Sequence, residues 1–114
     1  MRENMSRKGV IRVEHIREIT KEEVNDRLGN DANMVIIDVR EDEEVEQGMI
    51  EGAKHIPLDK IPFSVNDLDK EKDYVLVCRS GGRSMTAAAF LDEHSFKVSS
   101  LKGGMKEWTG KDNL

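Results

Sequence analysis

The sequence is poor in cysteine, proline, aromatic residues and long apolar runs. Its 114 residues include one Cys, two Pro, one Trp, one Tyr and three Phe. A single cysteine cannot form an internal disulfide, which suits a reducing compartment, and we expect the cytoplasm. No apolar run approaches the roughly 20 residues that cross a bilayer. The first residues, MRENMSRKGV, also lack the apolar centre of a secretory signal, so we expect no membrane partner.

Charge and histidine spacing exclude two further classes. The net charge is −5, which makes nucleic acid an unsuitable partner. The three histidines, His15, His55 and His94, lie far apart and lack the spacing of metal ligands, so we expect neither a metal nor a cofactor. Basic residues are in excess over residues 2–18. We interpret 1–14 as a solvated lead-in segment, rather than an arm for an anionic partner, and 15–114 as one domain.

Hydrophobic patterning predicts alternating strands and helices. Short apolar runs predict strands at 34–38 and 73–77. We interpret KVSSL at 97–101 as a third strand, and KHIPL at 54–58 as a shorter extended piece. Helices are predicted at 21–28, in the acidic segment ending at Gly48, at 83–94 and at 103–108. The first begins with a capping box, Thr20 with Glu23, and the apolar stripe of the third includes Ala87, Leu91 and His94. The alternation favours a parallel α/β sheet with helices on both faces.

The cysteine lies where such a sheet places its chemistry. The segment CRSGGRS, residues 78–84, follows a predicted buried strand and precedes a predicted helix. Ligands of parallel sheets bind at the carboxyl ends of the strands. Gly81 and Gly82 allow positive φ, so the loop can turn successive N–H groups inward as an anion nest, beside the N-terminus of the helix. Arg79 and Arg83 add two positive charges.

These features suffice to activate a thiol. Lowering a cysteine pKa from ~8.5 to ~6.5 requires about 2.7 kcal/mol. A helix terminus supplies up to ~2 kcal/mol and each hydrogen bond to a charged group ~1.5–3 kcal/mol. Cys78 is therefore the candidate nucleophile. The alternative is a buried structural cysteine followed by ordinary turn glycines.

Four segments, in order, resemble the signatures of single-domain rhodaneses, which are thiosulfate or persulfide sulfurtransferases. They are IIDVRE at 36–41, GMIEGAKHIPL at 48–58, CRSGGRS at 78–84 and LKGGMKEW at 101–108. The resemblance spans Ile16 to Trp108 and implies a rhodanese-like fold, a five-stranded parallel sheet flanked by helices. Met49 stands where the family usually has histidine, and His55 where it often has asparagine.

The resemblance also implies a reaction and its residues. Cys78 would attack the outer sulfur of a small-molecule donor, thiosulfate or a persulfide, and carry that sulfur as a persulfide. Cyanide, a small thiol or a protein thiol would then remove the sulfur, in covalent catalysis. Arg79 and Arg83 would bind the anionic donor, and Ser80, Gly81, Gly82 and Ser84 would contribute mainly backbone N–H groups. We interpret Asp38 with Arg40 as an ion pair bracing a loop, and His55 as a backbone-bracing group.

Two other functions are compatible with this fold. Cysteine phosphatases and arsenate reductases have five residues between cysteine and arginine, whereas four separate Cys78 from Arg83. The shorter ring suits a sulfur atom better than a tetrahedral oxyanion. Non-catalytic rhodanese-like binding modules typically lack the cysteine, which this chain retains.

Overall fold

A computed structural model describes residues 12–109 as a five-stranded parallel sheet with strand order β1-β5-β4-β2-β3. The strands are β1 (Glu18–Ile19), β2 (Met34–Asp38), β3 (Lys54–His55), β4 (Asp73–Val77) and β5 (Lys97–Leu101). The α-helices are α1 (Lys21–Arg27), α2 (Asp42–Val45) and α3 (Gly82–Glu93). The 3-10 helices in this described part of the chain are η2 (Leu58–Phe63), η3 (Val65–Asp67) and η4 (Met105–Glu107).

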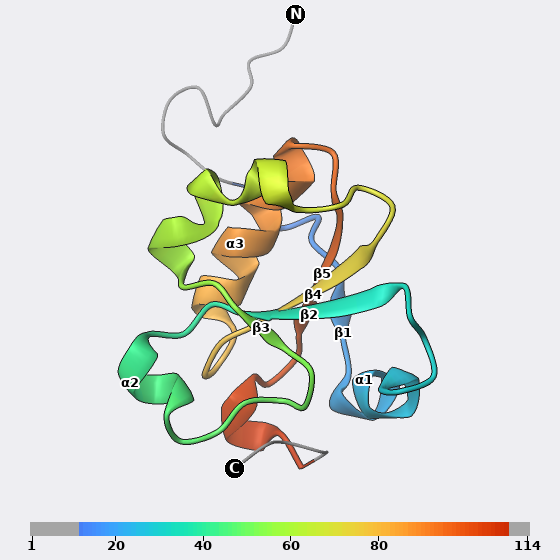
Figure 1. Ribbon diagram of the computed structural model, residues 1–114, viewed down its shortest axis with the longest axis vertical. Coiled ribbons are helices and arrows are strands. Elements are labelled where there is room, and N and C mark those ends of the chain that lie inside the picture. Colours follow the sequence, from blue (N-terminus) through green and yellow to red (C-terminus); the bar gives the residue numbers. More distant parts are fainter. Residues whose placement is uncertain (1–11, 110–114) are drawn as a thin grey trace, which may run out of the picture.

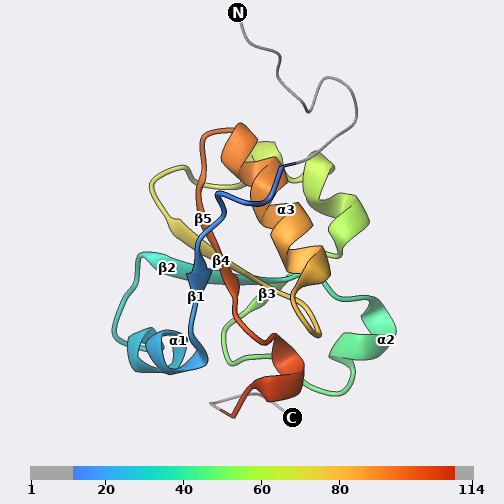
Figure 2. The same cartoon turned by 180° about the vertical axis from the view of Figure 1, so that it is seen from behind.

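Helices cover both faces of the sheet (Figures 1 and 2). One face packs against α3 and η2, with Leu76, Ala87 and Leu91 fully buried there. The other face packs against α1 and the segment around η4, where Val24 and Val75 are buried and Trp108 is partly buried. Strands β2 and β4 are thus covered by apolar side chains on both faces, which explains why their sequences are nearly continuous apolar runs. No helix among residues 12–109 combines the length and apolar character needed to span a membrane.

The predicted strands at 34–38, 73–77 and 97–101 match β2, β4 and β5 residue for residue. Helix α3 begins and ends one residue earlier than predicted. The capping box of α1 is present: the Glu23 N–H donates to the Thr20 hydroxyl and the Thr20 N–H donates to the Glu23 carboxylate. The apolar stripe of α3 ends before His94, which is exposed and places Nδ1 2.9 Å from the carbonyl of Phe90.

The edge strand β1 was not predicted from the sequence. It is two residues long and pairs with β5 through Glu18 opposite Ser100 and Ile19 opposite Leu101. Two residues are too few for an alternating pattern, so this strand is defined by its partner. Most of the predicted lead-in 1–14 lies outside the described residues. Of its described part, Val13 packs against the core beside the buried Ile16.

Gly104 lets the segment after β5 approach the loop after β4. It has φ 64° and ψ −169°, a conformation essentially restricted to glycine. A Cβ at this position would lie 2.3 Å from the Arg79 carbonyl oxygen and 2.8 Å from that of Cys78. Those carbonyls instead accept hydrogen bonds from the N–H groups of Lys106 and Met105.

We expect Gly104→Ala to destabilise the protein more than Gly52→Ala. Both glycines have positive φ, but a Cβ on Gly52 would meet nothing within 4 Å. Gly52→Ala should cost about 1 kcal/mol in backbone strain, whereas Gly104→Ala adds a clash with rigid backbone and should cost about 3 kcal/mol or more. Urea unfolding measures both variants, and equal losses of stability would contradict the close approach.

Candidate functional site

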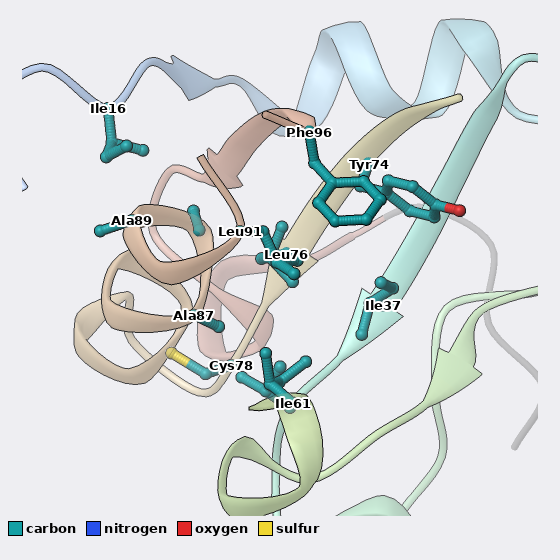
Figure 3. Packing of buried hydrophobic residues seen from close by; sticks show 12 residues of the cluster. Ile16, Ile37, Ile61, Tyr74, Leu76, Cys78, Ala87, Ala89, Leu91 and Phe96 are labelled. Atoms are coloured by element: carbon teal, nitrogen blue, oxygen red, sulfur yellow. The ribbon is translucent and has the colours of Figure 1, made fainter. Parts of the chain in front are cut away.

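Cys78 lies directly after β4, at the carboxyl end of a fully buried strand. Its side chain belongs to one of the two core clusters and lies beside Ala87 of α3 and Ile61 of η2 (Figure 3). The residue is 1% exposed. The chain then turns through residues 79–81 into α3, at the end of the sheet where α2 also lies (Figure 1). Gly81 has φ 122°, and this conformation directs its N–H toward the sulfur.

Backbone and hydroxyl groups surround the sulfur atom. Cys78 Sγ accepts hydrogen bonds from the Gly81 N–H at 3.0 Å and from the Ser84 N–H at 3.3 Å. The Ser84 hydroxyl is 3.4 Å from Sγ. Both amides belong to the first turn of α3 or its N-cap, where N–H groups have no partner inside the helix. The sulfur therefore occupies the anion-binding position of this helix.

Opposing effects determine the acidity of this thiol. Burial raises the pKa of Cys78, and it is the largest single effect. The hydrogen bonds from the Ser84 side chain and from the backbone of Ser84, Gly81 and Ser80 lower it, and together they hold the pKa below its usual value. The surroundings thus favour the thiolate, which is the nucleophilic form.

Arg83 pairs with an acidic residue of α2. Its two terminal nitrogens lie 2.6 and 2.8 Å from the two carboxylate oxygens of Glu44, a bidentate pair. The hydrogen bond from Arg83 lowers the pKa of Glu44 to about 2. This pair fastens the beginning of α3 to α2, and much of the Arg83 charge is already matched.

Arg79 and Lys106 line a hollow beside the loop. The hollow has a volume of about 300 Å³, and its lining also includes Arg40, Glu44, Gln47 and Met105. Arg40 and Glu44 are engaged by Asp38 and Arg83, whereas the Arg79 and Lys106 side chains make no hydrogen bond or ion pair with the described residues. Both are exposed, and the Lys106 N–H donates to the Arg79 carbonyl at 3.0 Å. Two cationic side chains without a partner among the described residues therefore line this hollow beside the loop.

Asp38 and Arg40 form the ion pair expected for them. Arg40 is 7% exposed, and its Nη2 lies 2.8 Å from Asp38 Oδ2 and 2.7 Å from the Gly48 carbonyl. His55 Nε2 lies 2.7 Å from the Arg40 carbonyl, which makes His55 the backbone brace that was predicted. These residues hold the segment after β2 and reach neither the sulfur nor its amide donors.

The structure brings together the predicted loop residues and adds others that the sequence did not single out. Ser84 contributes a hydroxyl as well as its N–H. Glu44, Lys106 and Ser100 come from α2, η4 and β5. The acidic segment before Gly48 offered carboxylates as partners for a loop arginine, but it contains five acidic residues, and the sequence does not distinguish Glu44 from the other four. Among residues 12–109, no group of three or more His, Cys, Asp or Glu side chains is arranged to hold a metal ion.

The fold and site define a class of small α/β domains that carry a cysteine in the loop after the central strand of a parallel sheet. Within that class, the chain belongs to the rhodanese-like domain family, whose model matches residues 20–111. It is 46% identical over 96 residues to a Bacillus subtilis protein named "Putative sulfurtransferase YtwF", covering 84% of this chain and 93% of the relative. It is also 35% identical to a sulfurtransferase of Allochromatium vinosum, covering 82% and 88%.

Solved structures agree with this assignment. A rhodanese-like domain protein from Staphylococcus aureus superposes with a TM-score of 0.78 at 35% identity, covering 83% of this chain and 93% of that one. A rhodanese-related protein from Thermoplasma volcanium gives 0.79 at 25% identity, covering 86% and 98%. The five-stranded rhodanese-like fold predicted from the sequence is thereby confirmed, as is the family.

The Glu44–Arg83 pair should make stability depend on acid. Glu44 has a folded-state pKa of about 2 and an ordinary value of 4.5 when unpaired, so its contribution to stability is complete above about pH 4.5. It is lost as the pH falls toward 2, when the unfolded chain binds the proton more readily. Glu44→Gln should therefore lower the free energy of unfolding at neutral pH. It should also make that free energy depend less on pH between about 4.5 and 2. Glu43→Gln, at an exposed neighbour, should leave both unchanged, as urea unfolding at several pH values would show; identical profiles for the two variants would contradict the role of the pair.

Proposed function

We propose that the protein is a sulfurtransferase that moves a sulfane sulfur from thiosulfate or a persulfide donor to a thiophilic acceptor through a Cys78 persulfide. One observation carries the proposal: the sole cysteine of the chain places its sulfur within hydrogen-bond distance of the Gly81 and Ser84 N–H groups. Sulfurtransferase relatives covering most of this chain support the same reaction class.

The reaction exchanges one sulfur–sulfur bond for another. The Cys78 thiolate attacks the outer sulfur of thiosulfate, a new S–S bond forms, and sulfite leaves with the electron pair of the broken bond. Cyanide or a thiolate acceptor then attacks the outer sulfur of the persulfide. Thiocyanate or a new persulfide leaves, and the Cys78 thiolate is regenerated. No proton or external electron is required in either step when donor and acceptor enter as anions.

The residues around Cys78 take separate roles in this scheme. The N–H groups of Ser80, Gly81 and Ser84 stabilise negative charge on the attacking sulfur and on the persulfide. Arg79 and Lys106, with unmatched charges beside the loop, attract the anionic donor. Arg83, paired with Glu44, positions the loop and adds positive potential, and Gly82 begins α3. The alternative phosphatase reaction lacks a comparable observation, because four residues rather than five lie between Cys78 and Arg83.

The partners follow from the chemistry. The donor is a small anionic sulfur compound, and the acceptor is cyanide, a small thiol or a protein thiol. A Bacillus subtilis relative named "Putative sulfur carrier protein YrkF" is 38% identical over 97 residues, and this chain spans 52% of its length. A cytoplasmic location provides the reducing conditions that keep Cys78 free.

Cys78→Ser should abolish sulfur transfer while leaving the fold intact. Intact mass after mixing with thiosulfate should show the wild-type protein heavier by one sulfur, and cyanide should remove it. The variant should gain nothing, because the chain has no second thiol. Turnover of the variant at the wild-type rate would refute the assignment. Hydrolysis of an aryl phosphate by the wild type, without sulfur loading, would instead favour the phosphatase.

Lys106→Glu should weaken the use of thiosulfate more than Lys102→Glu does. Both lysines are exposed in the segment after β5, but Lys102 lines a different hollow with Thr20, Lys21, Glu22 and Glu107. Reversing the Lys106 charge should raise KM for thiosulfate about fivefold, with kcat nearly unchanged and the effect shrinking in high salt. Equal KM values for the two variants in a thiocyanate assay would show that Lys106 does not attract the donor.

A further inference from the structure

A buried hydroxyl of β5 lies behind the hydroxyl that faces the thiol. Ser100 Oγ is 2.7 Å from Ser84 Oγ, and Ser84 Oγ is 3.4 Å from Cys78 Sγ. Ser84 is fully buried, and Ser100 and Cys78 are each 1% exposed. These three side chains therefore form a line from the sheet to the nucleophile, shielded from water.

The number of protons on these groups determines which of them donates each hydrogen bond. Ser84 Oγ carries one proton and also lies 3.0 Å from the Gly81 carbonyl, to which it donates. When Cys78 is a neutral thiol, its S–H donates a hydrogen bond to Ser84 Oγ, and the Ser84 O–H donates a hydrogen bond to the Gly81 carbonyl. When Cys78 is a thiolate, the Ser84 hydroxyl has to turn its proton to the sulfur. Ser84 has a proton free for either acceptor only while Ser100 donates to it.

We propose that Ser100 is a positioning residue, which donates to the Ser84 hydroxyl and so keeps that hydroxyl available to stabilise the Cys78 thiolate. This inference rests on the proposed function, because it concerns the reactivity of Cys78 as the nucleophile. In the described part of the chain, Ser84 is the sole hydrogen-bond partner of the Ser100 hydroxyl. A hydroxyl that accepts one hydrogen bond becomes a stronger donor in the next, and this polarisation is greatest in a dry interior.

The charged groups around the thiol are the same in every variant used to test this proposal. They come from the end of β2 and the segment after it, from α2, from the loop, from α3 and from η4: Asp38, Arg40, Glu44, Arg79, Arg83 and Lys106. The element η2 brings the apolar Ile61 to the same cluster. Replacing a serine hydroxyl changes none of these charges, so a shift in thiol titration reports the hydrogen bonds.

The chain provides a matched control at the adjacent position. Ser99 is also buried in β5, at 1% exposure, but successive residues of a strand face opposite sides of the sheet. Ser99 Oγ has no hydrogen-bond partner among the described residues. Ser99→Ala and Ser100→Ala thus remove the same hydroxyl group from neighbouring buried positions. Only the Ser100 hydroxyl is hydrogen-bonded to Ser84.

The experiment titrates Cys78 in the wild type, Ser99→Ala, Ser100→Ala, Ser84→Ala and the Ser84→Ala/Ser100→Ala double variant. Thiolate absorbance in the ultraviolet, with Cys78→Ser as the blank, gives the midpoint without requiring access of a reagent. Alkylation rate against pH gives it a second time. We expect the wild-type midpoint to lie below that of a free cysteine. Ser84→Ala should raise it by about one unit, through loss of a hydrogen bond to a charged group. Ser100→Ala should raise it by about 0.3 unit, which halves the thiolate well below the midpoint.

The double variant decides the route. If Ser100 acts through Ser84, Ser100→Ala adds no shift to Ser84→Ala, and Ser99→Ala matches the wild type. A Ser100→Ala midpoint equal to the wild type overturns the proposal, and so do additive shifts in the double variant. Urea unfolding of each variant verifies that the titrated protein is folded, and a variant that is not folded is replaced by Ser→Gly at the same position. Because the titration needs no sulfur donor, its failure is distinct from a failure of sulfur loading at Cys78.

Discussion

The convergence of loop N–H groups on one buried sulfur is the interaction on which the rest of the site depends. It requires a positive φ at Gly81 and the free amides at the beginning of α3, and it requires the loop to stay in place. Three restraints hold it. Strand β4 fixes Cys78 between β2 and β5, Gly104 allows η4 to donate to the Cys78 carbonyl, and the Glu44–Arg83 pair ties α3 to α2.

This arrangement makes amide dipoles, rather than a base or a single cation, the means of stabilising the thiolate. Burial opposes ionisation, so the donors must first offset it before they lower the pKa. Hydrogen bonds to a charged acceptor contribute about 1.5–3 kcal/mol each, so two amides and a hydroxyl are sufficient to offset burial and lower the pKa of Cys78. Arg83 adds less than its formal charge suggests, because Glu44 lies 2.6 Å away.

The sequence predicted the parts of this molecule that have local signals. Continuous apolar runs located β2 and β4, the segment KVSSL located β5, the capping box located α1, and the glycines beside Cys78 indicated the anion nest. The remaining parts depend on contacts between distant residues. Strand β1 is defined by pairing with β5, Arg83 meets a carboxylate 39 positions away, and Ser100 reaches Ser84 from another strand. A serine in a strand has no pattern that distinguishes it from its neighbour, and only the register of β5 shows that Ser100 faces α3 while Ser99 does not.

In the proposed reaction, the groups that stabilise the sulfur are separate from those that would meet the anionic donor. The donors to Sγ are buried backbone and hydroxyl groups fixed by the fold, whereas Arg79 and Lys106 are exposed side chains on its surface. Changing an exposed side chain leaves the amide positions intact, because backbone N–H groups belong to every residue. Substitution of Arg79 or Lys106 should therefore alter which anionic donor is attracted, while the reactivity of the Cys78 thiolate is unchanged. If Ser100 acts through Ser84 as proposed, a change in the buried line Ser100–Ser84–Cys78 should instead alter the reactivity of the thiolate toward every donor alike.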